Sequence, residues 1–247
     1  MTNDLIMPQS RGNVLVVGVY LADKPNLAAP LTQSLLQSEQ WTVQCQWARL
    51  GSQLAEAPLA NQTRLNISQR MDKYVVINLL LAEIDCSHFD YIFIVDDDIT
   101  VPDHFIDSYL EIVSKRDFSL SQPARTHSSF IDHYFVAQLI GIESRLTNFV
   151  EIGPIVCFHR SSYSVLLPLD EEAPMGWGLD FIWPVQMNHN GLRMGIVDQF
   201  PVEHSFRKPV QYYDYADSDY RMKKYFESRD HLSYEQSFIT FESFPLT

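Results

Sequence analysis

The feature that most restricts the fold is a pair of apolar runs rich in β-branched residues. Asn13–Leu21 is almost continuously apolar, and residues 91–95 are apolar throughout. Such runs are typical of strands buried on both faces of a parallel sheet. Between them the sequence predicts a helix over 27–37, a strand over 41–48 and a long helix over 64–84. Alternating strands and helices indicate an α/β layered fold.

The second half of the chain is less regular. Its pattern predicts a helix over 102–114, strands over 149–159 and 193–198, and a helix over 177–188. No linker composition interrupts the chain. We therefore predict one continuous domain over 1–247. It would comprise a nucleotide-binding half (1–100), an acceptor and catalytic half (101–210) and a C-terminal extension (211–247), which begins at Gln211 and folds over the site.

Charge and cysteine content exclude several classes of protein. The chain has 18 Lys and Arg against 31 Asp and Glu, a net charge of -13, and such a field repels nucleic acid. Three widely spaced cysteines predict no disulfide framework or zinc knuckle. Residues 1–12 lack the apolar core of a signal peptide, and no run is long enough for a transmembrane segment. We expect a soluble, cytoplasmic protein.

Three consecutive aspartates, Asp96, Asp97 and Asp98, follow the second apolar run directly. In open α/β sheets the carboxyl ends of the strands face the ligand. Asp96 and Asp98 are two residues apart, so an extended backbone projects both side chains to the same side. Adjacent carboxylates repel unless a cation lies between them. This arrangement suits Mn²⁺ or Mg²⁺, which complete their coordination with phosphate oxygens and water.

Other readings of the aspartates remain open at this point. An acidic residue just before Pro102 is also a common helix cap. The pattern from Asp96 to Thr100 also resembles the first motif of haloacid-dehalogenase-like phosphatases, in which Asp96 would be the nucleophile. An apolar strand followed by Asp-x-Asp is, equally, the metal motif of GT-A glycosyltransferases.

Three later features bear on this choice. Glu151 is a lone carboxylate among apolar residues, Asp180 follows a Gly-Trp-Gly turn at a predicted helix start, and His204 lies beyond the last predicted strand. Each has an ordinary explanation as well: an edge-strand charge, a partner for the positive end of a helix, and a surface imidazole.

Taken in order, these motifs resemble those of inverting GT-A glycosyltransferases. Residues 90–204 are also similar to a glycosyltransferase-like family, a domain of unknown function. Its triple-Asp strand end, Val-Glu strand, Trp-Gly-Leu-Asp motif and Val-Val-Asp-like strand correspond here to residues 95–99, 149–156, 177–181 and 195–198. The resemblance covers about half the chain. The later phosphatase motifs are missing from the sequence.

The resemblance implies a GT-A-like fold with a Rossmann-like nucleotide-binding half and a central mixed, mostly parallel sheet flanked by helices. It also implies a Mn²⁺- or Mg²⁺-dependent transfer of sugar from a UDP- or GDP-linked donor to a carbohydrate or other hydroxyl acceptor. Asp180 would be the general base. The metal ligands would be Asp96, Asp98 and His204.

The remaining expected site residues bind donor or acceptor. The nucleotide would be bound by Val19, Tyr20, Asp23, Lys73, Asp96 and Asp97, although Lys73 can equally be a solvated helix lysine and Asp97 a cap. The sugars would be bound by Glu151, Trp177 and Gly178. The alternatives to a transferase are a phosphatase that uses Asp96 and a non-catalytic nucleotide-sugar-binding protein.

Overall fold

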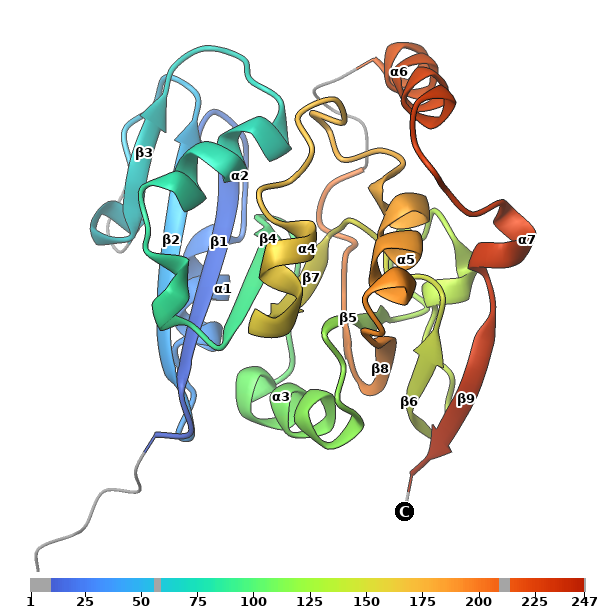
Figure 1. The fold of residues 1–247 in the computed structure, drawn as a ribbon. Helices are drawn as coiled ribbons and strands as arrows, with labels where there is room; N and C mark the ends of the chain where they lie inside the picture. The colour runs from blue at the N-terminus through green and yellow to red at the C-terminus, as the bar shows by residue number, and fades with distance from the viewer. Residues whose placement is uncertain (1–9, 56–58, 209–213, 247) are drawn as a thin grey trace, which may run out of the picture.

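The computed structural model describes residues 10–55, 59–208 and 214–246, whose strands form one nine-stranded sheet (Figure 1). The strands are β1 (Asn13–Leu21), β2 (Thr42–Leu50), β3 (Thr63–Ile67), β4 (Tyr91–Asp96), β5 (Leu120–Arg125), β6 (Ile142–Thr147), β7 (Ile155–His159), β8 (Met194–Val202) and β9 (Thr240–Pro245). The α-helices are α1 (Ala28–Leu35), α2 (Lys73–Ala82), α3 (Phe105–Arg116), α4 (Tyr163–Leu166), α5 (Leu179–His189), α6 (Tyr215–Glu227) and α7 (Tyr234–Ser237). Short 3₁₀ helices are η1 (Leu59–Asn61), η2 (Cys86–His88), η3 (Tyr134–Val136) and η4 (Arg160–Ser162).

The strand order is β3-β2-β1-β4-β7-β5-β8-β6-β9. Strands β3, β2, β1 and β4 pair in parallel, as do β5 and β8, and the other neighbours are antiparallel. Strand β7 joins the first block to the second, and its pairing with β5 extends over only two residue pairs, Leu120 with Phe158 and Ser121 with Cys157. The mixed, helix-flanked sheet confirms the predicted α/β fold class.

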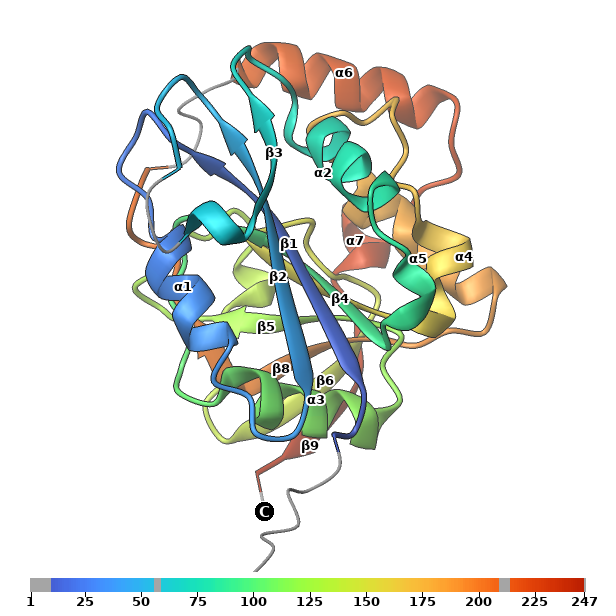
Figure 2. The same cartoon turned by 90° about the vertical axis from the view of Figure 1, so that its left-hand side faces the viewer.

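Helices cover both faces of the sheet, as the continuous apolar character of β1 predicts. Alternate residues of a strand face opposite sides. Leu15 and Val17 therefore pack in a cluster with α2, α4 and α5, whereas Val14 and Val16 pack with α1 and α3 (Figure 2). Residues of β4 belong alternately to both clusters, so this strand is held by packing from two sides.

Several predicted elements were wrong in extent. The helix expected over 64–84 is instead β3 followed by α2, because residues 63–67 alternate between half-buried and exposed side chains, as an edge strand does. The strand expected over 149–159 begins only at Ile155, and residues 149–154 form an irregular segment. Strands β5, β6 and β9 were not predicted.

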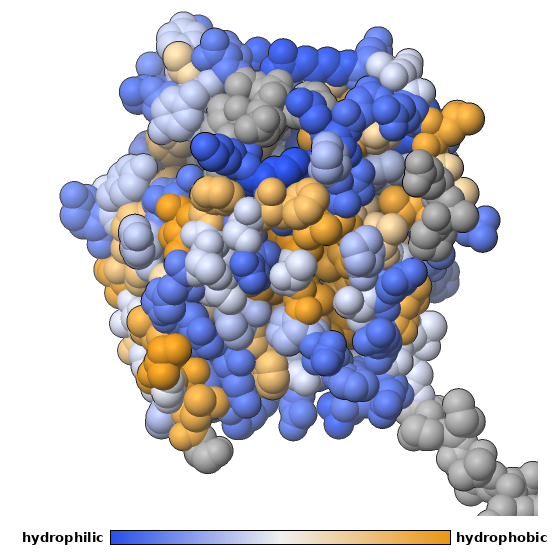
Figure 3. Space-filling view, turned by 180° about the vertical axis from the view of Figure 1, so that it is seen from behind, coloured by the Kyte–Doolittle hydropathy of each residue, from blue (hydrophilic) through white to orange (hydrophobic). Residues whose placement is uncertain are grey.

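No helix within the described ranges is long and apolar enough to cross a membrane. On the rear surface, hydrophilic residues predominate toward the top and bottom, and hydrophobic residues gather across the middle (Figure 3). Residues 1–9 lie outside the described residues, and they make up most of the segment that was predicted not to be a signal peptide. The start of the predicted extension, residues 211–213, also lies outside them.

Candidate functional site

The three predicted metal ligands meet at the end of β4. One ligand atom from each of Asp96, Asp98 and His204 lies within 4.8 Å of the others. His204 comes from the segment after β8, which two backbone hydrogen bonds of 3.0 Å between Thr100 and Glu203 tie to the chain after β4. Residues that are about a hundred positions apart are thereby brought into one cluster.

The donor set of this cluster fits a divalent cation. The Nε2 atom of His204 lies 3.2 Å from Oδ1 of Asp98, and both side chains are largely buried. Carboxylate oxygens suit Mg²⁺ and Mn²⁺, whereas an imidazole nitrogen is a better ligand for a transition metal than for Mg²⁺. Two carboxylates with one imidazole therefore favour Mn²⁺.

Asp97 is not one of the three clustered ligands and is held by other contacts. It is 2% exposed, accepts a 2.8 Å hydrogen bond from the Leu21 backbone N–H, and pairs with Arg207. Burial raises the pKa of Asp97 to about 6, although Arg207 opposes this rise. In this structure Asp97 fixes the end of β1, and its predicted part in nucleotide binding stays a prediction.

Arg207 is a cationic residue at the site, and the sequence analysis did not predict it. Its guanidinium lies 3.1 Å from Oδ2 of Asp98 as well as against Asp97. Burial on its own raises the pKa of Asp98, but the hydrogen bond and charge of His204 and the charge of Arg207 bring it below the ordinary value. The sequence signal for Arg207 was its position three residues after the candidate ligand His204.

Lys73, the first residue of α2, forms an ion pair with Asp96. The backbone of Gly153 lies close to both, since a Cβ added there would lie 3.4 Å from Oδ2 of Asp96 and 3.6 Å from Nζ of Lys73. Lys73 is thus part of the acidic cluster rather than a solvated helix lysine.

Glu151 lies in the irregular segment before β7 and is 3% exposed. It pairs with Arg125 and, at 2.9 Å, with Nδ1 of His133. Burial alone lowers the pKa of His133, but the hydrogen bond and charge of Glu151 raise it above the ordinary value. Arg125 also donates to the Gly153 carbonyl, so the segment beside Asp96 is clamped to β5.

Neither Arg125 nor His133 was among the expected site residues. Arg125 ends the unpredicted strand β5, and His133 precedes η3. The role of Glu151 in binding sugars stays a prediction, and its carboxylate is already held by Arg125 and His133.

Asp180 is the second residue of α5, is 5% exposed, and has an Oδ1 atom with no hydrogen-bond partner among the described residues. Burial raises the pKa of Asp180 to about 7. The charge of His133 lowers it and that of Glu151 raises it. Burial is also the main cause of the raised pKa of Tyr74, and the charges of both Asp96 and Asp180 add to this rise.

The Gly-Trp-Gly turn before Asp180 depends on both glycines. Gly176 and Gly178 have φ angles of 83° and 95°, in the region that disfavours side chains. A Cβ at Gly176 would lie 2.2 Å from the Tyr74 ring, and one at Gly178 would lie 2.9 Å from Phe226 on α6. The turn therefore packs directly against α2 and α6.

The residues expected in the nucleotide pocket lie at the carboxyl end of β1. Val19 pairs with Asp96 in the register of β1 and β4. Tyr20 is buried, with its hydroxyl 3.1 Å from Oγ1 of Thr63. Asp23 accepts hydrogen bonds from the backbone of residues 52 and 53, so it orders the turn after β2. Their roles toward a nucleotide stay predictions.

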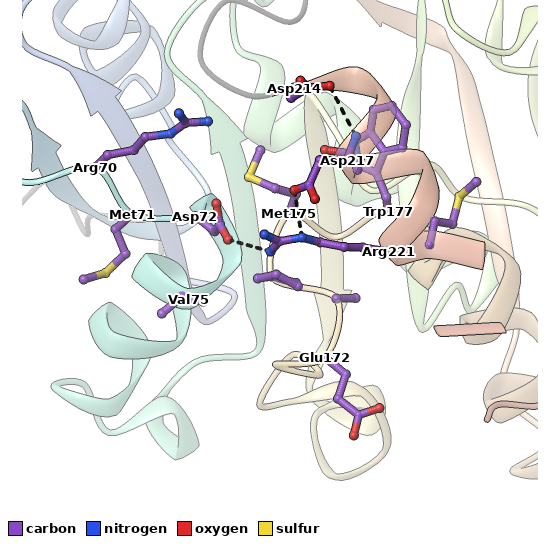
Figure 4. Close-up of a pocket in the computed structure, with 14 residues that line it drawn as sticks. Arg70, Met71, Asp72, Val75, Glu172, Met175, Trp177, Asp214, Asp217 and Arg221 are labelled. Carbon is purple, nitrogen blue, oxygen red and sulfur yellow. Dashed lines mark hydrogen bonds and ion pairs between the residues drawn. The ribbon is translucent and has the colours of Figure 1, made fainter. Parts of the chain in front are cut away.

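A pocket of about 660 Å³ lies between the start of α2 and α6 (Figure 4). It is lined by the start of α2, residues 172–177 and one face of α6. Trp177 is part of this lining, with its ring 5.1 Å from that of Tyr215. The four residues Asp96, Asp98, Asp180 and His204 do not line it.

Comparisons with known proteins bear mainly on the fold. A model described as "Protein of unknown function (DUF707)" matches residues 78–145. No curated protein matches the chain. GalNAc-T7 crystallised with UDP, GalNAc and Mn²⁺ is structurally similar, with a TM-score of 0.57, 10% identity and coverage of 87% of this chain and 47% of that one.

Staphylococcus aureus TarS is similar as well, with a TM-score of 0.53, 9% identity and coverage of 91% of this chain and 41% of that one. Its 1–349 fragment in complex with UDP-GlcNAc gives a TM-score of 0.53 at 9% identity, over 91% of this chain and 69% of that one. The chain spans less than half the length of the first two structures. The GT-A glycosyltransferase fold is thereby confirmed.

Proposed function

We propose that the chain is a metal-dependent glycosyltransferase that moves a sugar from a UDP- or GDP-linked donor to an acceptor hydroxyl. The observation that carries this proposal is the cluster of Asp96, Asp98 and His204 at the carboxyl end of β4 in a GT-A fold. Similar folds crystallised with UDP and Mn²⁺ and with UDP-GlcNAc support a nucleotide-sugar as the donor class.

The donor would be bound at the end of β1 and β4. Asp96, Asp98 and His204 would hold Mn²⁺, which neutralises charge that develops on the leaving diphosphate. Arg207 and Lys73 already lie against the same carboxylates. These cations would bind phosphate oxygens and would supply pre-positioned positive charge where negative charge grows.

Asp180 is the proposed general base. Its unpartnered Oδ1 atom can accept the proton of an acceptor hydroxyl, and a pKa of about 7 suits proton transfer near neutral pH. As the proton moves to Asp180, the acceptor oxygen bonds to the anomeric carbon while that carbon's bond to the phosphate oxygen breaks. Attack from the side opposite the leaving group inverts the configuration. Glu151, Trp177 and Gly178 would surround the reacting sugars.

The test is a thermal-shift panel of nucleotide-sugars with and without Mn²⁺. We expect stabilisation that requires metal and nucleotide together, is lost in Asp98→Asn and is kept in Asp103→Asn. The second variant is a matched control, because it removes the same charge from an exposed position five residues further along.

Two outcomes would replace the proposal. Nucleotide-sugar binding without turnover across a broad panel of hydroxyl acceptors would indicate a binding protein. Phosphomonoester hydrolysis that is lost in Asp96→Asn would indicate the phosphatase.

A further inference from the structure

The lining of the pocket between α2 and α6 has an apolar part. Trp177 and three methionines, Met71, Met175 and Met222, contribute to its lining. An aromatic face and flexible thioether side chains offer contact to the C–H faces of a ring without fixing its shape closely. The volume of about 660 Å³ falls within the range of small-molecule sites, about 300–1,000 Å³.

The rim of the same pocket is acidic. Asp72, Glu172, Asp214 and Asp217 line it, against Arg70 and Arg221. Arg221 extends from α6 toward α2 (Figure 4), with its guanidinium 2.8 Å from Asp217 and 3.7 Å from Asp72. Its charge is therefore already balanced within the pocket. Glu172 is likewise paired, at 3.0 Å, with Arg229. The lining then keeps one carboxylate more than its guanidinium groups, which repels anions and favours hydroxyl or amine donors.

Two chain segments connect this pocket to the proposed reaction site. Asp72 lines the pocket, and the next residue, Lys73, contacts Asp96. Trp177 lines the pocket, and Asp180 follows three residues later, a span of at most about 11 Å even if extended. The pocket therefore lies next to the two segments that carry Lys73 and Asp180.

We infer that this pocket is the acceptor site and that it accepts the end of a neutral or amino-bearing glycan rather than an anionic one. The inference rests on the proposed function, because it assigns the substrate that Asp180 deprotonates. A sugar ring meets both parts of the lining: its C–H face would pack on Trp177, and its hydroxyl or amino groups would donate to the rim carboxylates.

The test measures oligosaccharide binding by calorimetry in the presence of UDP and Mn²⁺. The probes are tetramers of glucosamine, of N-acetylglucosamine and of galacturonate. Val75→Trp fills the pocket from α2, and Leu79→Trp places the same side chain one helical turn further along, at an exposed position outside the pocket. We expect binding of the first two probes to the parent chain and to Leu79→Trp, and binding at least about tenfold weaker to Val75→Trp.

A charge variant tests the second part of the inference. Asp217→Asn removes a rim carboxylate from an i,i+4 pair with Arg221, and Asp219→Asn removes one from an i,i+4 pair with Lys223 outside the pocket. One charge near a ligand in water is worth about a fivefold change in affinity. Only Asp217→Asn should weaken glucosamine-tetramer binding by about that factor.

Equal binding of the galacturonate tetramer, equal binding by Val75→Trp and Leu79→Trp, or no binding of any tetramer to the parent chain would overturn the inference. The proposed function is judged separately by UDP binding that depends on Mn²⁺ and Asp98. If that binding persists while the tetramers fail, only the acceptor assignment is wrong. If that binding is absent, the glycosyltransferase proposal is wrong, whatever the tetramers do.

Discussion

The buried carboxyl of Asp180 should make the stability of the protein depend on pH in a way that a substitution removes. In the fold, burial raises the pKa of this group from an ordinary 3.8 to about 7. Between these values the folded chain keeps a proton that the unfolded chain has lost. The free energy of unfolding therefore falls as pH rises through this window and is constant above it. Because Asp180 is 5% exposed, solvent screens little of the effect.

The size of the effect follows from the two pKa values. At 1.36 kcal/mol for each pH unit, the rise from 3.8 to about 7 corresponds to about 4 kcal/mol. Asp180→Asn has no ionisation in this range, so relative to the variant the parent should lose stability by roughly this amount between pH 4 and pH 8. Any constant cost of burying the amide cancels in this comparison.

The assay is urea unfolding of both proteins at pH 4, 5, 6, 7 and 8. A stability difference between the proteins that stays flat across this range would refute the raised pKa of Asp180. The same pair tests its proposed role: kcat/KM of the parent should rise with pH through about 7, and Asp180→Asn should lower turnover about 10²- to 10⁴-fold. A variant with undiminished turnover would exclude Asp180 as the base.

Three further substitutions have defined outcomes. Asp98→Asn removes a proposed metal ligand, so calorimetry should show UDP affinity that no longer increases when Mn²⁺ is added; retained Mn²⁺ dependence would place the metal elsewhere. Arg207→Gln leaves the buried Asp97 without its cation, which typically costs about 3–5 kcal/mol of stability. The loss in the free energy of unfolding, measured with urea, should be larger at pH 8, where Asp97 is ionised, than at pH 5. Gly178→Ala adds a Cβ 2.9 Å from Phe226 at a φ of 95°. We expect it to lower the free energy of unfolding by about 1–3 kcal/mol, and with it the melting temperature. An unchanged melting temperature would contradict the described packing of the turn on α6.

The sequence predicted an element most accurately where a single physical requirement determines that element. The run before Asp96 has to be a strand buried on two faces, and both its ends were predicted to within one residue. The boundary near Ile67 failed because a short edge strand is followed closely by a helix. The apolar residues of α2 could be extended backward in helical register without a break in composition.

The contacts around the candidate site were harder to predict, because they come from segments distant in sequence. Arg125 lies 26 residues from its partner Glu151, and Arg207 lies 110 residues from Asp97. Such pairs depend on which strands become neighbours. Without β5 in the predicted sheet, no local pattern could place Arg125 beside Glu151.

The two-pair contact between β5 and β7 has a mechanical consequence. Asp96 and Asp98 belong to the block that ends in β4, whereas His204 follows β8 in the other block. With the proposed ligand set, one ion would link the two blocks across the shortest strand pairing in the sheet. The two blocks could then separate at this pairing only if the ion were released. A ligand that binds only the closed form stabilises that form. Bound metal would thus add to the free energy that holds the two blocks together.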